Sequence, residues 1–480
     1  MPPSGSATMD VAPYSLTLDR IAALAKRRGF VFPSSEIYGG LANSYDYGPL
    51  GAQLLKNIRD LWWREFITKR ADMVGLDSAI ILHPQTWVAS GHVGSFTDPL
   101  VEDKVTHKRY RADHLIEAWL EANGNRAQVD VTEMKTPDMA AFLREQKVTS
   151  PDGNPITEPK DFNILFETGI GTIAGEKSVA YLRGETAQGI FTNFKQILNS
   201  TRVKLPFGVG QMGKSFRNEI TTGQFIFRTL EFEQAEIEYF FDPEETPWQP
   251  LFRQWQEDMW HFITQRLGIR TDHLRWRRHS DRERSHYSTD TYDLDYRYPF
   301  GWKELWGIAY RTDYDLRQHM KHSGQSLEYL DSGTGKKIVP HVIEPAVGIN
   351  RLLLMVLCDG YWEDTERNRT VLKLHPAVAP YQAAVFPLVK NKAELVEQAR
   401  NLFDELLEEM AVVWDDRGNI GKRYLAQDEI GTPFSITVDY QTLDEQSVTV
   451  RNRDDTSQER VNVTQLSSYL RDRMRAKQNS

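Results

Sequence analysis

A stretch of regular two-residue alternation in the middle of the sequence constrains the fold most. Residues 227–241, FRTLEFEQAEIEYFF, alternate with the period of a β-strand. This period places Phe232, Gln234 and Glu236 on the same face. An aromatic ring, an amide and a carboxylate in a row make a poor hydrophobic core, because buried polar groups need partners. We therefore predict a sheet whose face carries a binding floor on this strand.

Other segments predict the remaining parts of a mixed α and β fold. Residues 301–316 and 341–345 are predicted strands, and residues 51–69 have apolar side chains at helical spacing. That helical stripe consists of Leu54, Leu55, Ile58, Leu61, Trp62 and Phe66. A stripe so wide and rich in Trp suits burial against a core or against a partner subunit. A shorter helix is expected near residues 114–120, and the turn-rich SPDGNP that follows is typical of a surface insertion.

The pattern changes near residues 364–370, where the charged run DTERNRT separates two regions. A chain of 480 residues also exceeds what one hydrophobic core usually serves. Beyond the boundary the pattern alternates between strand and helix, which predicts a small α/β domain. The expected elements are a strand at 371–374, a helix at 394–410, a strand at 412–414, a loop at 415–424, a strand at 434–439 and a helix at 464–475.

Composition limits the compartment and the partners. The single cysteine, Cys358, excludes an internal disulfide, and its apolar surroundings predict a buried thiol in a reducing, cytoplasmic protein. No stretch approaches the ~20 apolar residues of a membrane helix, and residues 1–14 are expected to be a short flexible leader rather than a secretory signal. The net charge of −9 argues against indiscriminate nucleic-acid binding but does not exclude a local basic site for one.

Two glycine-rich segments resemble nucleotide-binding loops, but neither fits the pattern that such a loop requires. GVGQMG at 208–213 matches GxGxxG, but no helix opens on its last glycine to hold a pyrophosphate. A nicotinamide-dependent oxidoreductase rests on this segment alone and is excluded with it. SGTGKK at 332–337 lacks the first glycine of a phosphate loop and is predicted to be a hairpin turn.

Three segments carry charged residues that no structural need explains. Arg217 and Glu219 lie in GKSFRNEI at 213–220 and are predicted to share a strand face. The alternating strand follows, and EPAVGINRLLLMVL at 344–357 predicts a strand end, a turn and a helix with Arg351 in its first turn. A cation at a helix N-terminus is unfavourable unless an anion lies there, and a nucleotide phosphate would supply one. Each segment alone is explained by a surface ion pair, but their occurrence together in this order is not.

These three segments resemble motifs 2 and 3 of the class II aminoacyl-tRNA synthetases, and residues 51–84 resemble motif 1, their dimer-forming element. Further segments, among them LRGETAQGIF at 182–191 and GWKELWGIAYRTDYDL at 301–316, are similar to the homodimeric glycine enzymes. The similarity extends from about residue 15 to the end of the chain. It implies an α+β fold with an antiparallel-sheet catalytic domain flanked by helices and a smaller α/β anticodon-binding domain. The implied bounds are 15–366 for the catalytic domain, about 113–180 for an insertion in it, and 370–480 for the anticodon-binding domain.

The resemblance implies a glycine–tRNA ligase. Such an enzyme activates glycine with ATP to glycyl-adenylate and pyrophosphate, then transfers glycine to the 3′ end of tRNA(Gly). Mg²⁺, a cytoplasmic homodimer and no membrane association are implied as well. Activation is an attack of a carboxylate on the α-phosphate, so the protein must position reactants and neutralise charge rather than supply a nucleophile.

The resemblance also assigns residues to the ATP site. Arg217 would hold the α-phosphate, Glu219 would lie near the adenine amino group, and Phe232 would stack under the adenine. Arg351 would cover the other face of the adenine or reach the γ-phosphate, and Glu304 would position Mg²⁺; Arg217, Glu219 and Arg351 are the predicted catalytic residues. The full predicted ATP site is Arg217, Asn218, Glu219, Phe227, Arg228, Thr229, Leu230, Glu231, Phe232, Glu304, Leu305, Gly348, Ile349, Asn350 and Arg351.

Glycine offers no side chain, so its ammonium group must be recognised by carboxylates. The resemblance places Glu185, Glu236 and Glu344 around it, and gives Arg111 and Arg311 the substrate carboxylate or the adenylate phosphate. The full predicted glycine site is Arg111, Glu185, Phe232, Glu233, Gln234, Ala235, Glu236, Arg311, Glu344, Pro345, Ala346, Val347 and Gly348. The family usually has serine where this chain has Ala346, and losing that hydroxyl removes a contact worth ~0.5–1.5 kcal/mol.

Transfer RNA contacts are assigned to basic residues outside the cavity. Lys422 and Arg423 of the predicted loop would contact phosphates or bases. The basic run Arg275, Arg277, Arg278, Arg282 and Arg284 is expected either to touch the acceptor stem or to be a solvated loop.

Two other functions are also compatible with the sequence. One is a non-catalytic, synthetase-like accessory subunit that binds nucleic acid, which would be expected to have broken motifs. The other is a synthetase for a different amino acid, which Ala346 favours slightly and the three carboxylates oppose.

Overall fold

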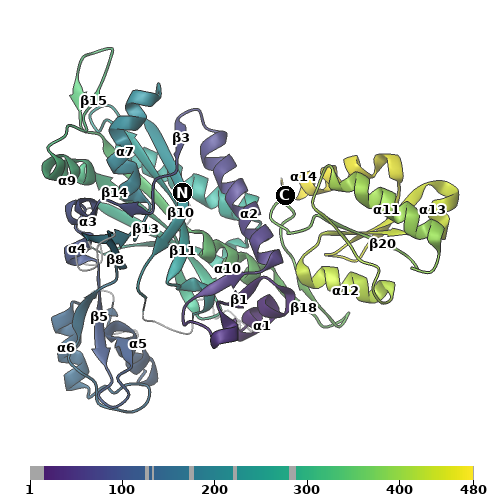
Figure 1. Cartoon of the computed structure of the whole chain (residues 1–480), viewed down its shortest axis with the longest axis horizontal. Helices are drawn as coiled ribbons and strands as arrows, with labels where there is room; N and C mark the ends of the chain where they lie inside the picture. Colours follow the sequence, from purple (N-terminus) through teal and green to yellow (C-terminus); the bar gives the residue numbers. More distant parts are fainter. Residues whose placement is uncertain are drawn as a thin grey trace.

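The computed structural model describes residues 16–124, 129–131, 134–171, 178–219, 224–280 and 288–478, with side chains to residue 475. The predicted leader at 1–14, and Arg282 and Arg284 of the basic run, lie outside these ranges. Figure 1 shows a large body that contains the first three quarters of the chain and a smaller body at its side that contains the C-terminal quarter. None of the described helices is both long enough and apolar enough to cross a bilayer.

A seven-stranded sheet forms the centre of the large body. Every neighbouring pair of strands in it is antiparallel except β10 and β3, which are parallel. In spatial order the strands are β12 (Leu274–Arg278), β13 (Asp290–Tyr298), β14 (Gly301–Thr312), β17 (His341–Gly348), β11 (Glu231–Phe241), β10 (Phe207–Phe216) and β3 (Met73–Leu76). The predicted antiparallel sheet is therefore confirmed, with β11 near its middle.

The two faces of the sheet pack against different helices. Ala235 and Ile237 of β11 lie in the main hydrophobic core with α2 (Pro49–Trp63), α8 (Trp248–His261) and α10 (Ile349–Gly360). Phe240 points to the opposite face and packs in a second core with α7 (Ala187–Ser200), next to α9 (Tyr314–Ser323). The second core covers only one end of that face, so the other end of the same strand remains open.

Helix α2 confirms the helix predicted at 51–69. It begins with Pro49 in its first turn and continues through a π-helical turn, Arg64–Thr68. Leu54, Ile58 and Trp62 are fully buried in the main core. The chain's own core thus accounts for most of the predicted apolar stripe, and the stripe by itself does not require a partner subunit.

The predicted surface insertion forms a compact unit with its own core, visible at the lower left of Figure 1. It contains the sheet β6-β5-β7 (Arg109–Arg111, Thr97–Glu102, Lys160–Asn163) and the helices α5 (Ala112–Ala122) and α6 (Thr136–Glu145). Helix α5 confirms the helix predicted near 114–120. Because strand β5 supplies Val101 to this core, the unit begins before residue 113.

Short elements complete the large body. They are α1 (Leu18–Arg28), β1 (Val31–Pro33), β2 (Tyr45–Tyr47), β4 (Ile81–Leu82), α3 (Pro84–Ala89), α4 (His92–Ser95), β8 (Glu167–Ile170), β9 (Ser178–Leu182), β15 (Tyr329–Leu330), β16 (Lys337–Ile338), β18 (Tyr361–Asp364) and β19 (Arg369–Leu372). GVGQMG lies inside strand β10, and SGTGKK forms the turn between β15 and β16. Both interpretations of these segments are therefore confirmed.

The C-terminal body is an α/β domain with a separate core. Its five-stranded sheet has the order β21-β20-β22-β23-β24 (Val412–Trp414, Ala383–Pro387, Phe434–Val438, Ser447–Asn452, Gln458–Asn462). Its helices are α11 (Ala393–Leu407), α12 (Ile420–Ile430), α13 (Tyr440–Glu445) and α14 (Leu466–Gln478). The helix predicted at 394–410, the strands at 412–414 and 434–439, and the last helix are confirmed.

Two predictions for this domain were wrong. Residues 371–374 do not enter its sheet, because 369–372 form the hairpin strand β19, and the first strand of the domain is β20. The predicted loop 415–424 ends in helix α12, which begins at Ile420. The Asn419 side chain accepts a hydrogen bond from the Lys422 N–H at 2.9 Å, which is an N-cap that starts a helix.

Candidate active site

A cavity lies over the open end of the sheet face described above. Across the antiparallel ladder, Glu236 of β11 lies opposite Ala346 of β17, and Ala346 lies opposite Gly307 of β14. Phe232, Gln234 and Glu236 all line the cavity, as the two-residue period predicted. The complete lining is Glu185, Arg217, Glu219, Ile226, Phe227, Arg228, Thr229, Phe232, Gln234, Glu236, Glu304, Gly307, Glu344, Ala346, Val347, Gly348, Asn350 and Arg351.

Arg217 and Glu219 enter the cavity from the end of strand β10. The strand ends at Phe216, so both residues lie in the extended segment just beyond it rather than on the strand itself. The Arg217 Nε donates to the Gly184 carbonyl at 3.0 Å, and the guanidinium lies 5.2 Å from the Phe232 ring centre. Stacking on an aromatic face orients an arginine and leaves its edge available to an anion.

Arg351 enters the cavity from the first turn of helix α10. Its Nη1 contacts the Glu304 carboxylate and donates to the Glu304 carbonyl, both at 3.1 Å. The guanidinium also lies 4.3 Å from the Phe227 ring centre. Burial would raise the pKa of Glu304, but the Arg351 charge and hydrogen bond outweigh it and lower that pKa. The anion beside this helix start in the structure is therefore the Glu304 carboxylate, and the nucleotide phosphate expected there stays a prediction.

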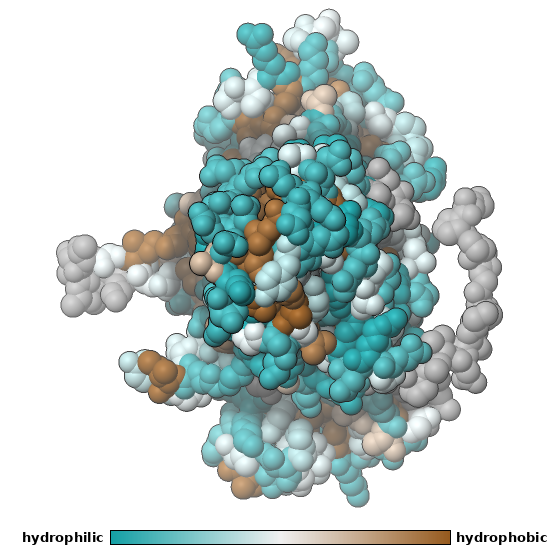
Figure 2. Space-filling view, turned by 90° about the vertical axis from the view of Figure 1, so that its right-hand side faces the viewer, coloured by the Kyte–Doolittle hydropathy of each residue, from teal (hydrophilic) through white to brown (hydrophobic). Residues whose placement is uncertain are grey.

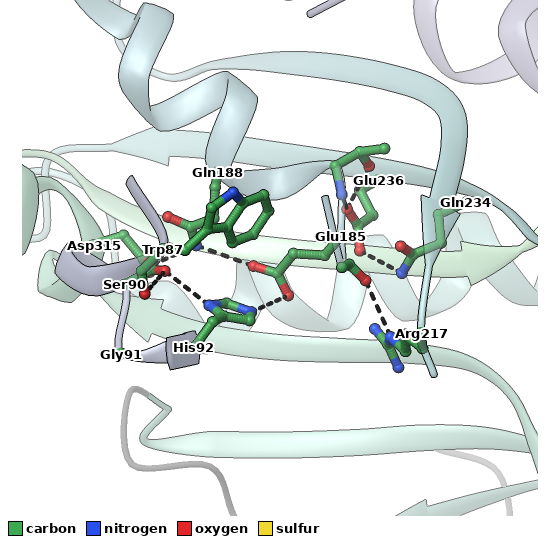
Figure 3. A network of polar contacts seen from close by, with 12 residues as sticks. Trp87, Ser90, Gly91, His92, Glu185, Gln188, Arg217, Gln234, Glu236 and Asp315 are labelled. Carbon is green, nitrogen blue, oxygen red and sulfur yellow. Dashed lines mark hydrogen bonds and ion pairs between the residues drawn. The ribbon is translucent and has the colours of Figure 1, made fainter. Parts of the chain in front are cut away.

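The opposite end of the cavity is acidic, and neighbouring side chains hold its carboxylates in place (Figure 3). Glu236 accepts hydrogen bonds from the Thr186 N–H at 2.7 Å and from the Gln234 amide at 2.9 Å. Glu185 lies 3.3 Å from His92 Nε2 and accepts from the Gln188 amide at 3.0 Å. Together with Glu344, these carboxylates form the acidic group predicted for an ammonium ion.

The three carboxylates differ in pKa because their partners differ. Burial raises the pKa of Glu236, and the nearby Glu185 charge raises it further. Burial also raises the pKa of Glu344, while Arg311 opposes it and the charges of Glu236 and Glu185 add to it. For Glu185 the charge and hydrogen bond of His92 outweigh burial, so its pKa is lowered.

Several residues that position this acidic end had no predicted role. His92 and Gln188 contact Glu185, and Gln188 also donates to Asp315 (Figure 3). The Thr186 N–H donates to Glu236, and Asp315 accepts from Arg311. His92 lies in the four-residue helix α4, and Asp315 lies in helix α9. The only signal for these four residues was their presence in segments that resemble the glycine enzymes, namely WVASGHVGSFTDPL at 87–100 for His92, LRGETAQGIF at 182–191 for Thr186 and Gln188, and GWKELWGIAYRTDYDL at 301–316 for Asp315. No local pattern marks any of the four.

Arg311 and Arg111 were predicted to bind substrate, and the structure does not support either prediction. Arg311 is 1% exposed. Its guanidinium pairs with Asp315 at 2.8 Å and with both oxygens of Glu344 at 2.8 and 2.9 Å, so it holds the site rather than lining it. Arg111 is engaged by Asp98 and Asp113, each at 2.7 Å, outside the cavity lining. Their donors are occupied by carboxylates that the sequence pattern did not reveal.

The alternation of side chains along β11 places further residues of the predicted site outside the cavity. The Glu233 and Ala235 side chains point to the reverse face of β11. Glu233 pairs there with Arg59 of α2, and its N–H donates to Asn350 at 2.7 Å. Other predicted residues also lie outside the cavity lining, namely Asn218, Leu230, Glu231, Leu305, Pro345 and Ile349.

The two basic residues predicted to contact tRNA differ sharply in exposure. Lys422 is exposed in the first turn of α12. Arg423 is 2% exposed and donates to the carbonyls of Pro387, Asp416, Arg417 and Gly418. The guanidinium therefore holds the preceding loop, and contact of Arg423 with tRNA stays a prediction. Arg275, Arg277 and Arg278 lie on strand β12 and pair with aspartates of β13.

The described residues contain no cluster of three or more His, Cys, Asp or Glu side chains that could hold a metal by themselves. Glu304 offers one carboxylate at the cavity wall. This matches Mg²⁺, which keeps several waters and is usually bound by one or two carboxylates together with substrate phosphates.

Known proteins are similar to this chain over both of its bodies. The "Anticodon binding domain" family matches residues 382–473. The "Glycine--tRNA ligase" of Caldanaerobacter subterraneus subsp. tengcongensis is 48% identical over 468 residues, covering 96% of this chain and all of the relative. That of Streptomyces coelicolor is 49% identical over 468 residues, covering 95% of this chain and 98% of the relative. The chain belongs to the glycine–tRNA ligase family. Membership accounts for both bodies, since the relatives align over the large body and the C-terminal domain together.

Proposed function

We propose that this member of the glycine–tRNA ligases activates glycine with ATP and transfers it to the 3′ end of tRNA(Gly). One observation carries the proposal: a single cavity joins three carboxylates, Glu185, Glu236 and Glu344, to two arginines, Arg217 and Arg351. An ammonium ion fits the first group and a nucleotide phosphate fits the second. Glycine and ATP present these two charges, and the relatives bear the corresponding name.

Activation requires glycine to lie with its ammonium at the acidic end and its carboxylate toward Arg217. The carboxylate oxygen then attacks the α-phosphate of ATP, and the bond to the leaving pyrophosphate breaks. Arg217 is placed to neutralise charge at the α-phosphate, because Phe232 and Gly184 fix its orientation at the cavity wall. Held reactants convert the reaction into an effectively unimolecular step.

Arg351 and Glu304 serve the other end of the nucleotide. Phosphate would compete with Glu304 for the Arg351 guanidinium, which releases the Glu304 carboxylate to hold Mg²⁺ beside the phosphates. When bound, Mg²⁺ supplies further charge neutralisation. The accompanying proposal is that Glu219, Arg228 and Phe227 frame the adenine, since all three line the cavity.

Selectivity for glycine must come from walls that exclude any side chain. A single methylene in a pocket gives only ~1–3 kcal/mol of discrimination, so a steric clash has to supply the rest. Ala346 lies on the cavity floor between Glu236 and Gly307. We propose that this methyl group forms part of the floor beneath the glycine α-carbon.

The wider assignments are proposals of the same kind. We propose a cytoplasmic homodimer of the class II type, with a catalytic domain at 15–366 and an anticodon-binding domain at 370–480. Exposed apolar side chains of the short 3₁₀ helix Glu36–Tyr38, Ile37 and Tyr38 at 87% each, favour an interface there. Buried Cys358 is consistent with a reducing compartment. Sedimentation equilibrium of wild type and an Ile37→Ser, Tyr38→Ser double variant tests the dimer.

Binding of tRNA by the C-terminal domain is supported by its family match. Figure 2 views the molecule from the side of this domain and shows a largely hydrophilic surface with apolar side chains gathered near its centre. Exposed Lys422 lies on this domain, and we propose that it contacts the tRNA backbone.

The test of the function is amino-acid-dependent exchange of labelled pyrophosphate into ATP, scanned over all twenty amino acids without tRNA. Exchange with glycine alone is expected. Exchange with another amino acid would keep the mechanism and change the substrate. No exchange by folded protein with Mg²⁺ present would favour the accessory-subunit alternative.

A further inference from the structure

Glu238 is a buried carboxyl group that the proposed reaction does not use. It lies on β11 two residues beyond Glu236, so both side chains point to the same face of the sheet. Glu236 lines the cavity, whereas Phe240, two residues further on, packs in the second core. Glu238 therefore lies at the boundary between the ligand cavity and the apolar core behind it.

The surroundings of Glu238 supply no partner. The side chain is fully buried, and neither carboxylate oxygen has a hydrogen-bond partner among the described residues. An ionised carboxylate in such a place is strongly disfavoured, because burial of a charge costs far more than burial of a neutral acid.

The charged groups near Glu238 are Glu236 on its own strand, Glu344 of β17, Arg311 of β14 and Asp315 of α9, so negative charge is in excess; on its other side β10 places Val209 opposite it. In the antiparallel ladder Glu236 pairs with Ala346 and Tyr239 with Ile343, so Glu238 lies beside Glu344. Arg311 of β14 is the cation nearby, but it already pairs with Glu344 and with Asp315 of α9. Burial and the Glu344 charge raise the pKa of Glu238 well above its ordinary value. Arg311 donates to both oxygens of Glu344, whereas neither oxygen of Glu238 accepts a hydrogen bond from a described residue, so the ionised form is better stabilised at Glu344 and the proton stays on Glu238.

We propose that Glu238 is a protonated positioning residue whose proton is released when the ammonium of the substrate binds at the acidic end of the cavity. It touches no substrate atom. Its proton limits the repulsion among Glu236, Glu344 and itself while the cavity is empty. A bound ammonium adds a positive charge beside these groups and lets Glu238 ionise, with the proton passing to solvent. The coupling rests on the proposed function, since glycine supplies the ammonium.

If glycine binding and proton release are coupled, pH must change the affinity for glycine, and glycine must change the number of protons bound. If glycine binding expels a proton, a rise in pH must strengthen glycine binding. We expect the KM for glycine of the wild type to fall several-fold between about pH 6.5 and 8.5, and to change much less in Glu238→Gln. Titration of glycine itself is the same for both proteins and cancels in the comparison. Calorimetry in two buffers of different ionisation enthalpy should show proton release by the wild type and little or none by Glu238→Gln.

A second measurement needs no substrate. Because the folded protein binds the Glu238 proton more tightly than the unfolded chain, wild-type stability is lost as pH rises from about 4.3 toward the raised pKa. Glutamine cannot ionise, so Glu238→Gln should melt a few degrees above wild type near pH 8, with the difference closing near pH 5. Glu245→Gln, at an exposed position, is the matched control and should follow wild type at every pH.

The results of these experiments test the role of Glu238 separately from the proposed glycine–tRNA ligase function. Equal proton release by wild type and Glu238→Gln overturns the coupling even if glycine binds. Identical melting of the two at every pH overturns the protonated state. Absence of glycine binding by the wild type refutes the proposed function and the coupling, while melting still decides the protonation state. If Glu238→Gln does not fold, Glu238→Met takes its place, and the infrared carbonyl stretch of protonated carboxyl groups at neutral pH is compared with wild type: loss of intensity in the variant supports a protonated Glu238, and an unchanged band overturns it.

Discussion

Replacing Arg311 by methionine tests whether this arginine holds the site together or binds substrate. The change keeps the length of the side chain and removes its charge. Asp315 and Glu344, both nearly fully buried, would lose the guanidinium that contacts them at 2.8–2.9 Å. Removing one partner of a buried ion pair costs ~3–5 kcal/mol, because the remaining charge has no compensation. We therefore expect Arg311→Met to lower the free energy of unfolding of the large body by about that amount.

Chemical denaturation monitored by tryptophan fluorescence measures this loss. Arg317→Met is a close control, because Arg317 also pairs with an aspartate four residues away, Asp313, but its side chain is 62% exposed. Surface pairs contribute ~0–1 kcal/mol, so this control should be nearly neutral. If Arg311→Met is no more destabilising than Arg317→Met and only raises the KM for glycine, Arg311 binds the substrate and the structural interpretation is wrong.

Three further substitutions test the cavity and the C-terminal domain. Arg217→Ala should abolish glycine-dependent pyrophosphate exchange while leaving the unfolding midpoint close to that of wild type; near-normal exchange would contradict the phosphate role. Ala346→Ser adds a hydroxyl worth ~0.5–1.5 kcal/mol and should lower the KM for glycine by about 2- to 12-fold in the same exchange assay; an unchanged KM would show that this position does not contact glycine. Lys422→Ala should reduce aminoacylation at limiting tRNA without altering exchange, and equal loss in both assays would exclude a contact confined to tRNA.

The parts of the fold that sequence predicted best are those set by local periodicity. The two-residue period of β11 predicted which of its side chains line the cavity, and the helical stripe predicted which face of α2 is buried. Periodicity does not show how much of a strand face is covered by other elements. The same face of β11 is cavity at Glu236 and core at Phe240, because α7 and α9 cover only one end. That difference depends on helices distant in the sequence.

The errors have local and non-local causes. Helix α12 was missed because the N-cap of Asn419 lies in a segment that also contains Gly418 and Gly421, which are typical of loops. The partners of Arg111 and Arg311 could not be predicted as readily. Each lies near an aspartate in the sequence, but burial decides whether such a pair is a surface contact or a fixed structural one.

The arginines differ in how many of their guanidinium N–H donors already bind other groups of the protein. This number distinguishes arginines that can bind a ligand in the cavity from those that stabilise the fold. Arg311 and Arg423 are almost fully buried, and carboxylates or carbonyls surround their guanidinium groups. Arg217 makes one hydrogen bond to the described residues, from Nε, and lies against Phe232 at the cavity wall. An aromatic face holds a guanidinium without consuming its donors, whereas a carboxylate consumes two of them. An arginine held mainly by rings therefore keeps its hydrogen-bonding capacity for a phosphate. By this criterion Arg351, which rests on Phe227 but also pairs with Glu304, must exchange one anion for another when ATP binds.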